Sequence, residues 1–370
     1  MIKTLQSESI RIFNYDFELL GIISNYESFI YQRYFQECGN FEMHINMNKK
    51  NVDKLSTDTW LMLGNKSDKC FIIETIEENF SEGKDQLIIR GTDLKGLMKR
   101  RITYTDNFDR VENTPAENIM KHYVINHFID SRLASDATIQ LTERNVEVLQ
   151  VAKTQNRGPS TVWQSRFENV HDVLKHIAED TGLGWTIFAD LTNQKFVFDV
   201  LESTDRTLNQ KDVPQILFTK SKGNLRESRK YNDLSGLKNV AYVGGKGENE
   251  DRPIVVRGST YGINRREVFI DLNNIDDMDE LNLEGDKRLS EYKEINSTEG
   301  QVYSIENMEY EVDWFIGDKV SIKIDNLIDH KIVSAAREIY ERNNMNIEVT
   351  FGDKTPTIID ELNKGKEVVK

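Results

Sequence analysis

Apolar and polar residues alternate along much of this chain, and a period of two predicts more strands than helices. In residues 41–47, Phe41, Met43, Ile45 and Met47 fall on one face of an expected strand. Three later sets alternate in the same way: Phe196, Phe198 and Val200; Val320, Ile322 and Ile324; Ile347, Val349 and Phe351. A turn at residues 190–194 connects residues 185–188 to the first of these sets, which predicts a hairpin. We therefore expect an α+β protein that is rich in strands.

Three segments carry helix signals instead. Residues 92–101 begin with Thr92 as the expected N-cap and end in cations that suit the helix dipole. Residues 114–117 have the order of a capping box with proline at the first helical position. The apolar stripe of the helix that follows comprises Ile119, Met120, Tyr123, Val124 and Phe128. A third helix is expected from Asn169 to Gly182, and its inward positions are Val173, Leu174, Ile177 and Ala178.

The order of these elements divides the chain, whose 370 residues are enough for two to four domains. Residues 1–104 are a β-rich unit closed by a helix, 105–214 contain helix, strands, helix and hairpin, and 215–247 are a strand-bearing return segment. Residues 248–300 are the most acidic stretch, 301–352 are a compact strand-rich block, and 353–370 are a polar tail.

The sequence has the features of neither a membrane-spanning protein nor a protein with a signal peptide. The longest apolar runs, residues 60–63 and 71–73, are the length of strands, whereas a membrane span needs about 20 residues. The first eight residues lack the basic start and apolar core of a signal peptide, so we expect folding in the cytoplasm. Cys38 and Cys70 are expected to be reduced and buried, with a disulfide as the alternative.

The formal charge is −14, from 48 basic and 62 acidic residues. Sequence-specific nucleic-acid binders neutralise phosphates with lysine and arginine, so this balance argues against that class. A negative surface instead repels DNA and lets it pass without binding.

Residues that could carry catalysis do not form a recognisable set. The six histidines are His44, His122, His127, His171, His176 and His330. His122 and His127, like His171 and His176, are five residues apart, which places each pair about 140° off a shared helix face. We interpret all six as core or solvated residues. Cys38 has His44 nearby in the sequence but no evident residue to orient it.

Two further patterns suggest a ligand only weakly. Residues 244–247, Gly-Gly-Lys-Gly, lack the ending of a phosphate-binding loop and predict a tight hairpin turn. The densest acidic cluster comprises Asp271, Asp276, Asp277, Asp279, Glu280, Glu284 and Asp286. Because it lacks the regular spacing of a calcium loop, we interpret it as a solvated loop and keep an ion as the alternative. The many carboxylates also leave a glycosidase pair open. We assign no catalytic, cofactor-binding or metal residue.

Aromatic residues gather near the N-terminus. Tyr26, Phe29, Tyr31, Tyr34 and Phe35 fall within ten residues. Such residues line sugar-binding grooves, but they also fill subunit interfaces and barrel cores, which are more common.

Six segments, taken in order, resemble the siphophage tail-hub proteins, a family of minor tail or tail-associated proteins. The first runs from residues 17–28 through 32–35 to 38–43. The second, at residues 90–101, reads Arg-Gly-Thr-Asp-Leu-Lys-Gly-Leu-Met-Lys-Arg-Arg. The others are residues 174–185, 238–245, 264–271, and 310–313 with 317–320. The resemblance covers nearly all of residues 10–352.

This resemblance implies a fold like the myophage baseplate hub, with two small tube-type β-barrels and inserted α+β domains. Residues 1–104 with 215–247 would form the first barrel and 301–352 the second. Residues 105–214 and the acidic 248–300 would be the insertions. Many relatives continue into a peptidase, lysin or fibre region, and this chain stops 18 residues after Gly352. We therefore expect a partner to supply cell-wall degradation or receptor binding.

The function that the resemblance implies is a non-enzymatic structural hub in the virion, a homotrimer that closes the tail tube at the tail tip. Its implied partners are a distal tail protein, a tape measure protein and a receptor-binding protein or tail fibre. DNA would pass through the channel without specific binding, and no cofactor or membrane anchor is expected. Two alternatives are a carbohydrate-binding receptor protein and a tail-associated cell-wall hydrolase.

Overall fold

The structure, a computed structural model, describes residues 8–80, 85–104, 109–130, 141–303, 305, 308–341 and 344–353. The described residues form two compact units, the larger from residues up to 228 and from 299 to 352, the smaller from 229–298 with 353. The chain enters the smaller unit within β14 (Leu225–Asp233) and leaves it within β18 (Ile295–Val302). No helix among the described residues has the length and apolar character to cross a membrane.

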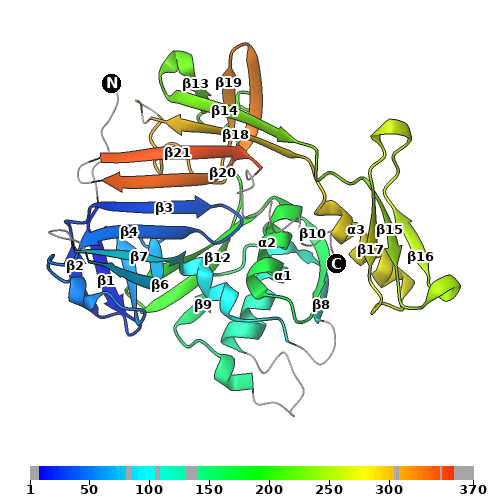
Figure 1. The fold of residues 1–370 in the computed structure, drawn as a ribbon, viewed down its shortest axis with the longest axis horizontal. Helices are drawn as coiled ribbons and strands as arrows, with labels where there is room; N and C mark the ends of the chain where they lie inside the picture. Colours follow the sequence, from blue (N-terminus) through cyan, green and yellow to red (C-terminus); the bar gives the residue numbers. More distant parts are fainter. Residues whose placement is uncertain are drawn as a thin grey trace. The chain divides into compact units, whose positions relative to one another are not determined.

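The main sheet of the larger unit has 13 strands. Their order is β14-β18-β21-β20-β3-β4-β7-β6-β5-β1-β2, and β13 extends the sheet from β19, which pairs with β20. Figure 1 shows β21, β20, β3 and β4 side by side. The remaining bounds are β1 (Ile10–Asn14), β2 (Leu19–Ile23), β3 (Ser28–Tyr34), β4 (Asn40–Asn46), β5 (Thr59–Leu63), β6 (Cys70–Asn79), β7 (Gln86–Asp93), β13 (Leu217–Thr219), β19 (Lys319–Ile324), β20 (Leu327–Glu341) and β21 (Asn344–Gly352).

The sheet has two halves that share β20. The first half contains β1 to β7, and the second contains β13, β14, β18, β19 and β21. Each half curves tightly around a core of its own. Phe29 on β3 and Phe71 on β6 are three strands apart, about 14 Å in a flat sheet, yet their ring centroids lie 5.0 Å apart. Phe218 on β13 and Phe351 on β21 are also three strands apart, with centroids at 5.2 Å. The aromatic and aliphatic residues that alternate along β3, β4, β19 and β21 fill these two cores, as their period of two predicts.

The prediction of two closed barrels is not confirmed, because the described strands of the main sheet form an open, branched sheet that ends at β2, β13 and β14. The reason is the length of β20, which belongs to both halves. Its first residues pair with β19 and its last, from Ala335, pair with β3, so the sheet continues where a barrel would close. The prediction of a strand-rich α+β protein is confirmed. The division of the chain into five domains stays a prediction.

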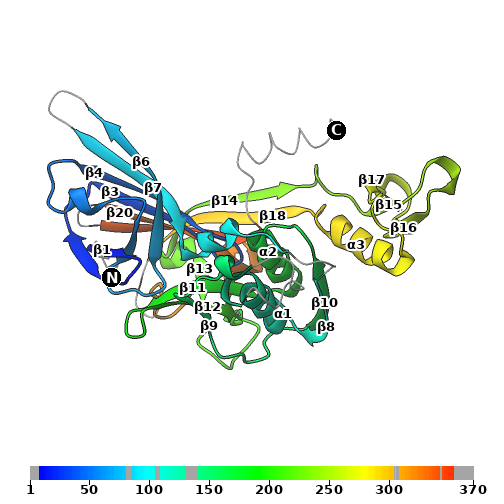
Figure 2. The same ribbon diagram turned by 90° about the horizontal axis from the view of Figure 1, so that it is seen from below.

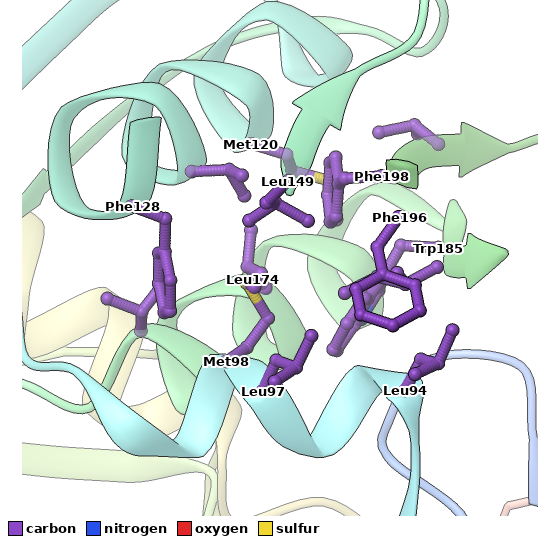
Figure 3. Packing of buried hydrophobic residues seen from close by; sticks show 14 of the residues in the cluster. Leu94, Leu97, Met98, Met120, Phe128, Leu149, Leu174, Trp185, Phe196 and Phe198 are labelled. Carbon is purple, nitrogen blue, oxygen red and sulfur yellow. The ribbon is translucent and has the colours of Figure 1, made fainter. Parts of the chain in front are cut away.

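A layer of helices and short strands covers the outer face of β1, β5 and β6. On β5, Trp60 and Met62 enter this layer while Leu61 and Leu63 enter the core of the first half. The layer contains α1 (Ala116–Val124), α2 (Val170–Thr181), the pair β8 (Asp109–Pro115) and β10 (Ser160–Ser165), and the sheet of β11 (Gly184–Asp190), β12 (Lys195–Leu201) and β9 (Leu149–Val151). Figure 3 shows its core, where side chains of the 3-10 helix Leu94–Arg100 lie opposite Met120, Leu174 and Phe196.

The predicted third helix and hairpin are confirmed. The Asn169 side chain accepts a hydrogen bond from the His171 amide at 3.0 Å, and α2 ends at Gly182 with φ 71°. In the hairpin, β11 and β12 pair with Asp190 opposite Lys195. All five residues of the predicted apolar stripe at 119–128 are buried.

Two predicted helix starts are wrong. Asp93, not Thr92, caps the segment after β7, and the segment is a 3-10 helix. Pro115 occupies the N-cap of α1 and no side chain caps that end. The Glu117 carboxylate instead points inward and pairs with Lys121, 2.7 Å away. Both side chains are buried, and a buried charge without a partner would be destabilising.

The smaller unit is a three-stranded sheet with one helix. Its strands are β16 (Ile254–Arg257), β15 (Val240–Gly244) and β17 (Glu267–Asp271), and α3 (Met278–Ser290) packs Leu281 against Ala241 and Val243. The tight turn predicted at residues 244–247 is wrong, since Gly244 pairs with Ile254 and residues 245–253 form the connection. Arg252 holds this connection by donating to the carbonyls of Gly244 and Gly245, both at 2.9 Å.

Candidate functional site: a buried ionic junction

Six charged side chains meet where β3 and β20 join the two halves of the sheet. We call this set the ionic junction, and its members are Arg33, Lys66, Asp68, Lys69, Glu311 and Glu338. Its three cations and three carboxylates cancel in formal charge. The side chains of Lys69 and Glu338 are 0% exposed. Burial of this kind is tolerated only when every charge is paired and hydrogen-bonded.

Glu338 on β20 is the deepest acceptor of the junction. Lys69 Nζ lies 2.6 Å from its Oε2 and 2.7 Å from Oε1 of Glu311. The hydroxyl of Tyr310 donates to Oε1 of Glu338 at 3.0 Å, and that of Tyr340 donates to Oε2 at 2.5 Å. Both carboxylate oxygens are therefore satisfied by residues from three separate segments.

Glu311 gathers the cations of the junction. Arg33 Nη1 donates to it at 2.8 Å and Lys66 Nζ at 2.9 Å, while Arg33 Nη2 also reaches Asp68 at 2.6 Å. Burial would raise the pKa of Glu311, but Lys69, Arg33 and Lys66 together lower it to about 2. Its backbone has φ 62°, a strained conformation for this residue type, which these contacts must offset.

The junction joins its segments through neutral hydroxyls as well as through charges. Burial, followed by the charge of Glu338, raises the pKa of Tyr310 and of Tyr340, so both hydroxyls stay neutral donors. A cavity next to the junction, lined by Tyr31, Arg33 and Asp93 among others, has a volume of about 10 Å³. That is room for one water molecule and far less than a small-molecule site needs.

Sequence reasoning missed the junction, although it used residues 310–313 as a family landmark. One signal was available. Along β20, Ala336, Glu338 and Tyr340 alternate onto one buried face, and a glutamate among apolar positions of a strand indicates a buried partner.

His122 and His127 contradict the prediction that they lie on different sides of their helix. His122 Nε2 lies 2.7 Å from Oδ1 of Asp109, and His127 Nε2 lies 3.8 Å from Oδ2 of the same carboxylate. They approach one residue because α1 continues into the π-helical turn Ile125–Ile129, whose wider turn brings positions five apart to the same side. Burial, with Arg144, lowers the pKa of His127 to about 4, so its ring is neutral near pH 7.

Cys38 and Cys70 are free and buried, as predicted, and burial raises the pKa of both thiols. The Cys38 amide donates to His171 Nε2 at 3.1 Å, whereas His44 lies 2.7 Å from Glu42, so no Cys38–His44 pair forms. Of the five clustered aromatic residues, only Tyr34 is outside the buried core. Tyr31, Tyr34 and Phe35 line the cavity of about 10 Å³ next to the junction, which is too small for a sugar.

The acidic cluster is not the predicted loop, because much of it forms α3. Asp277 caps this helix by accepting from the amides of Asp279 and Glu280 at 3.0 and 2.9 Å. Other members pair with cations: Asp271 with Arg252, Asp276 with Lys246, Glu284 with Arg288, and Asp286 with Arg257. Throughout the described ranges, no group of three histidine, cysteine or acidic side chains is arranged to hold a metal ion.

Comparison with known proteins gives one family and one fold. Residues 9–353 match the family described as Siphovirus ReqiPepy6 Gp37-like proteins. No curated protein matches the chain.

Three solved structures share the fold. The tail protein from Neisseria meningitidis MC58 has a TM-score of 0.57 and 13% identity, covering 94% of this chain and 97% of that one. The 43 kDa tail protein of prophage MuSo2 from Shewanella oneidensis has a TM-score of 0.56 and 11% identity, with 94% and 98% covered. Prophage tail protein gp18 from Listeria monocytogenes EGD-e has a TM-score of 0.53 and 12% identity, with 98% and 99% covered.

Proposed function

The chain belongs to the family of Siphovirus ReqiPepy6 Gp37-like proteins, a family of phage tail proteins, and from this membership we propose that it is the hub at the tail tip. Three copies form a ring that closes the tail tube. The ring connects the tube to a distal tail protein and to a receptor-binding protein or tail fibre, and it meets the tape measure protein on its inner side.

The observation that supports this proposal is the pair of curved sheet halves joined at β3 and β20. Each half surrounds its own aromatic core, so each takes the place of one of the two expected barrels even though the described strands do not close. Three subunits then present six similar halves to a tail tube of sixfold symmetry. The ionic junction fixes the angle between the halves, which such a match requires.

Charge supports a channel for DNA. A trimer carries about 3 × −14 = −42 formal charges, and a lumen lined by part of them repels passing DNA. The junction sums to zero, so this negative charge lies elsewhere in the chain. We also keep the five-part domain division as a proposal, which limited proteolysis at residues near 104, 214, 247 and 300 would test.

The experiment that tests the hub is a map of the assembled tail tip with its subunit count. We expect three copies on the tail axis, each contributing two sheet halves around an acidic lumen. Six copies in a true sixfold ring, a basic lumen, or a location at the tail periphery would each refute the proposal.

We further propose that the chain has no hydrolytic activity of its own. Purified protein run on host cell walls in a zymogram should give no cleared band. A band that a single carboxylate or cysteine substitution abolishes would establish the hydrolase alternative. The carbohydrate-binding alternative rested on the clustered aromatic residues, and their burial removes that support.

A further inference from the structure

A cleft lies between the turn that joins β5 to β6 and the end of the hairpin that β11 and β12 form (Figure 2). Its volume is about 380 Å³, within the roughly 300–1,000 Å³ of ligand pockets. The Ala189 amide donates to the Ser67 carbonyl at 2.9 Å, which holds the turn against β11. We call this space the turn cleft. Its two walls are the turn, with Met62, Asn65 and Ser67, and the hairpin end, with Phe188, Asp190 and Leu191.

Both walls of the turn cleft are fixed by contacts of their own. The turn carries Lys66 and Asp68 of the ionic junction. In the hairpin end, the Asp190 carboxylate accepts from the Asn193 side chain at 2.7 Å and from the amides of Thr192 and Asn193 at 3.0 and 3.1 Å. These hydrogen bonds, that of the Asn193 side chain first, lower the pKa of Asp190, so the cleft carries a negative charge near pH 7. A partner can therefore bind without the cost of ordering the walls.

The hairpin of β19 and β20 exposes two aliphatic side chains at its tip. Leu327 and Ile328 are 66% and 45% exposed, and they follow a tight turn in which Asp325 has φ 53°. The register places Lys323 opposite Ile328, and residues paired in this way have neighbouring side chains. Lys323 is exposed and forms no ion pair with a described residue. The tip therefore presents apolar surface and a positive charge together.

The tip and the turn cleft lie on different sides of the larger unit. Among the described strands, β20 pairs with β21 only from Val333 and with β3 only from Ala335, so the residues before them pair with β19 alone. Figure 1 shows β19 above and β12 below the paired strands β3 and β4. The two surfaces therefore do not meet within one copy of the chain.

We propose that the tip of the β19–β20 hairpin of one copy docks in the turn cleft of the next copy. Leu327 and Ile328 pack between the two walls, and Lys323 lies next to Asp190. This inference rests on the proposed ring of three copies, because a closed ring needs two different complementary surfaces on each subunit. The tip and the cleft match in charge and in apolar character, and their separate positions suit a head-to-tail contact.

Self-association of the full-length chain, measured by analytical ultracentrifugation, tests the contact. Ile328→Ser in the tip and Leu191→Ser in the cleft should each weaken the trimer at least tenfold, because each removes apolar surface that the contact buries. Ile254→Ser removes an isoleucine of similar exposure, 48%, from the smaller unit and should have no effect. All three side chains are exposed, so the melting temperature should stay unchanged in each variant.

A mixture of the two weakened variants tests whether the contact is head-to-tail. The Ile328→Ser chain keeps its cleft and the Leu191→Ser chain keeps its tip, so one intact contact can form between them. An equimolar mixture should give a heterodimer, although neither variant associates alone. Absence of that heterodimer would show that the tip of one copy does not enter the cleft of another.

The charged part of the contact is tested by a double-mutant cycle. Lys323→Gln and Asp190→Asn remove the charges and keep the size of the side chains, and the new amide oxygen can still accept from the backbone amides of the turn. Each variant should weaken the trimer about threefold. The two together should weaken it no more than either alone, because both remove the same interaction. Losses that multiply would show that Lys323 and Asp190 do not meet.

The outcomes separate this contact from the ring itself. A trimer that neither Ile328→Ser nor Leu191→Ser weakens overturns the contact and leaves the hub intact. If the ring forms only on the tail, Ile328→Ser subunits should be missing from assembled tails, and their normal incorporation would likewise overturn the contact. Assembled tails without a ring of three copies refute the hub, and the contact with it.

Discussion

Opposite charges meet in both units of the chain, in the ionic junction of the larger and around α3 of the smaller. In the junction, the side chains of Lys69 and Glu338 are 0% exposed. In the smaller unit, Lys246 and Asp276 are 59% and 70% exposed. Exposed pairs contribute about 0–1 kcal/mol, whereas removing one partner of a buried pair costs about 3–5 kcal/mol. The conspicuous acidic run therefore adds little to stability, whereas a few inconspicuous buried charges contribute much to the stability of the larger unit.

The difference also concerns specificity. The exposed pairs of the smaller unit join residues of one local sheet and helix, where packing already fixes the arrangement. The junction joins segments that are far apart in the chain, and its buried charges keep their partners only while those segments hold the observed positions.

The largest effect is expected from Lys69→Met. It leaves Glu338 and Glu311 buried without their shared cation, and we expect a loss of about 3–5 kcal/mol in the free energy of unfolding. Urea denaturation of the purified chain measures it. Lys246→Met removes a lysine from the exposed pair with Asp276 and should cost at most about 1 kcal/mol. Equal losses for the two variants would contradict the comparison.

A new charge in an apolar core provides the next test. Ile322 on β19 is 1% exposed in the core of the second half, and its neighbour Lys323 is exposed. Ile322→Asp buries an unpaired carboxylate and should cost roughly 3 kcal/mol, while Lys323→Asp should be mild. Thermal unfolding compares the two, and similar melting temperatures would show that the face assigned to this strand is wrong.

Acid should lower the stability of the larger unit through Glu311 of the junction. The folded pKa of Glu311 is about 2, below its usual 4.5, so its stabilisation is present above pH 4.5. It is lost as pH falls from 4.5 toward 2, by about 3 kcal/mol in all, of which about 2 kcal/mol is lost by pH 3. Stability measured between pH 6 and 3 should show this loss, and Glu311→Gln should flatten it. An unchanged slope in that variant would assign the acid sensitivity to other groups.

The elements that sequence predicted well are those whose signals are local. The alternation at residues 41–47 and the cap at Asn169 depend on neighbours within a few positions, so the strand faces and α2 followed from them. The capping box at residues 114–117 failed because burial against Lys121 competed for Glu117. The histidine spacing failed because a π-helical turn replaced the regular helix.

The candidate site was beyond sequence reasoning for a different reason. Lys69 and Glu338 are 269 positions apart, and no local pattern pairs two charges across that distance. The family resemblance supplied the fold class and the expectation of two barrels, but not the continuous β20 that keeps the sheet open. Which charges are buried depends on register between distant strands, and that appears only in the folded chain.

The smallest effect is expected where an exposed pair has its best geometry. Arg257 donates to both carboxylate oxygens of Asp286, through Nε to Oδ1 at 2.7 Å and through Nη2 to Oδ2. A bidentate contact is the favourable case for a surface pair, but Asp286 is 51% exposed and water competes for it. Asp286→Asn should therefore cost less than about 1 kcal/mol, and the cost should shrink further in 1 M salt. Denaturation of wild type and variant at low and high salt measures both differences, and a loss that salt does not reduce would show that this pair behaves like the buried junction.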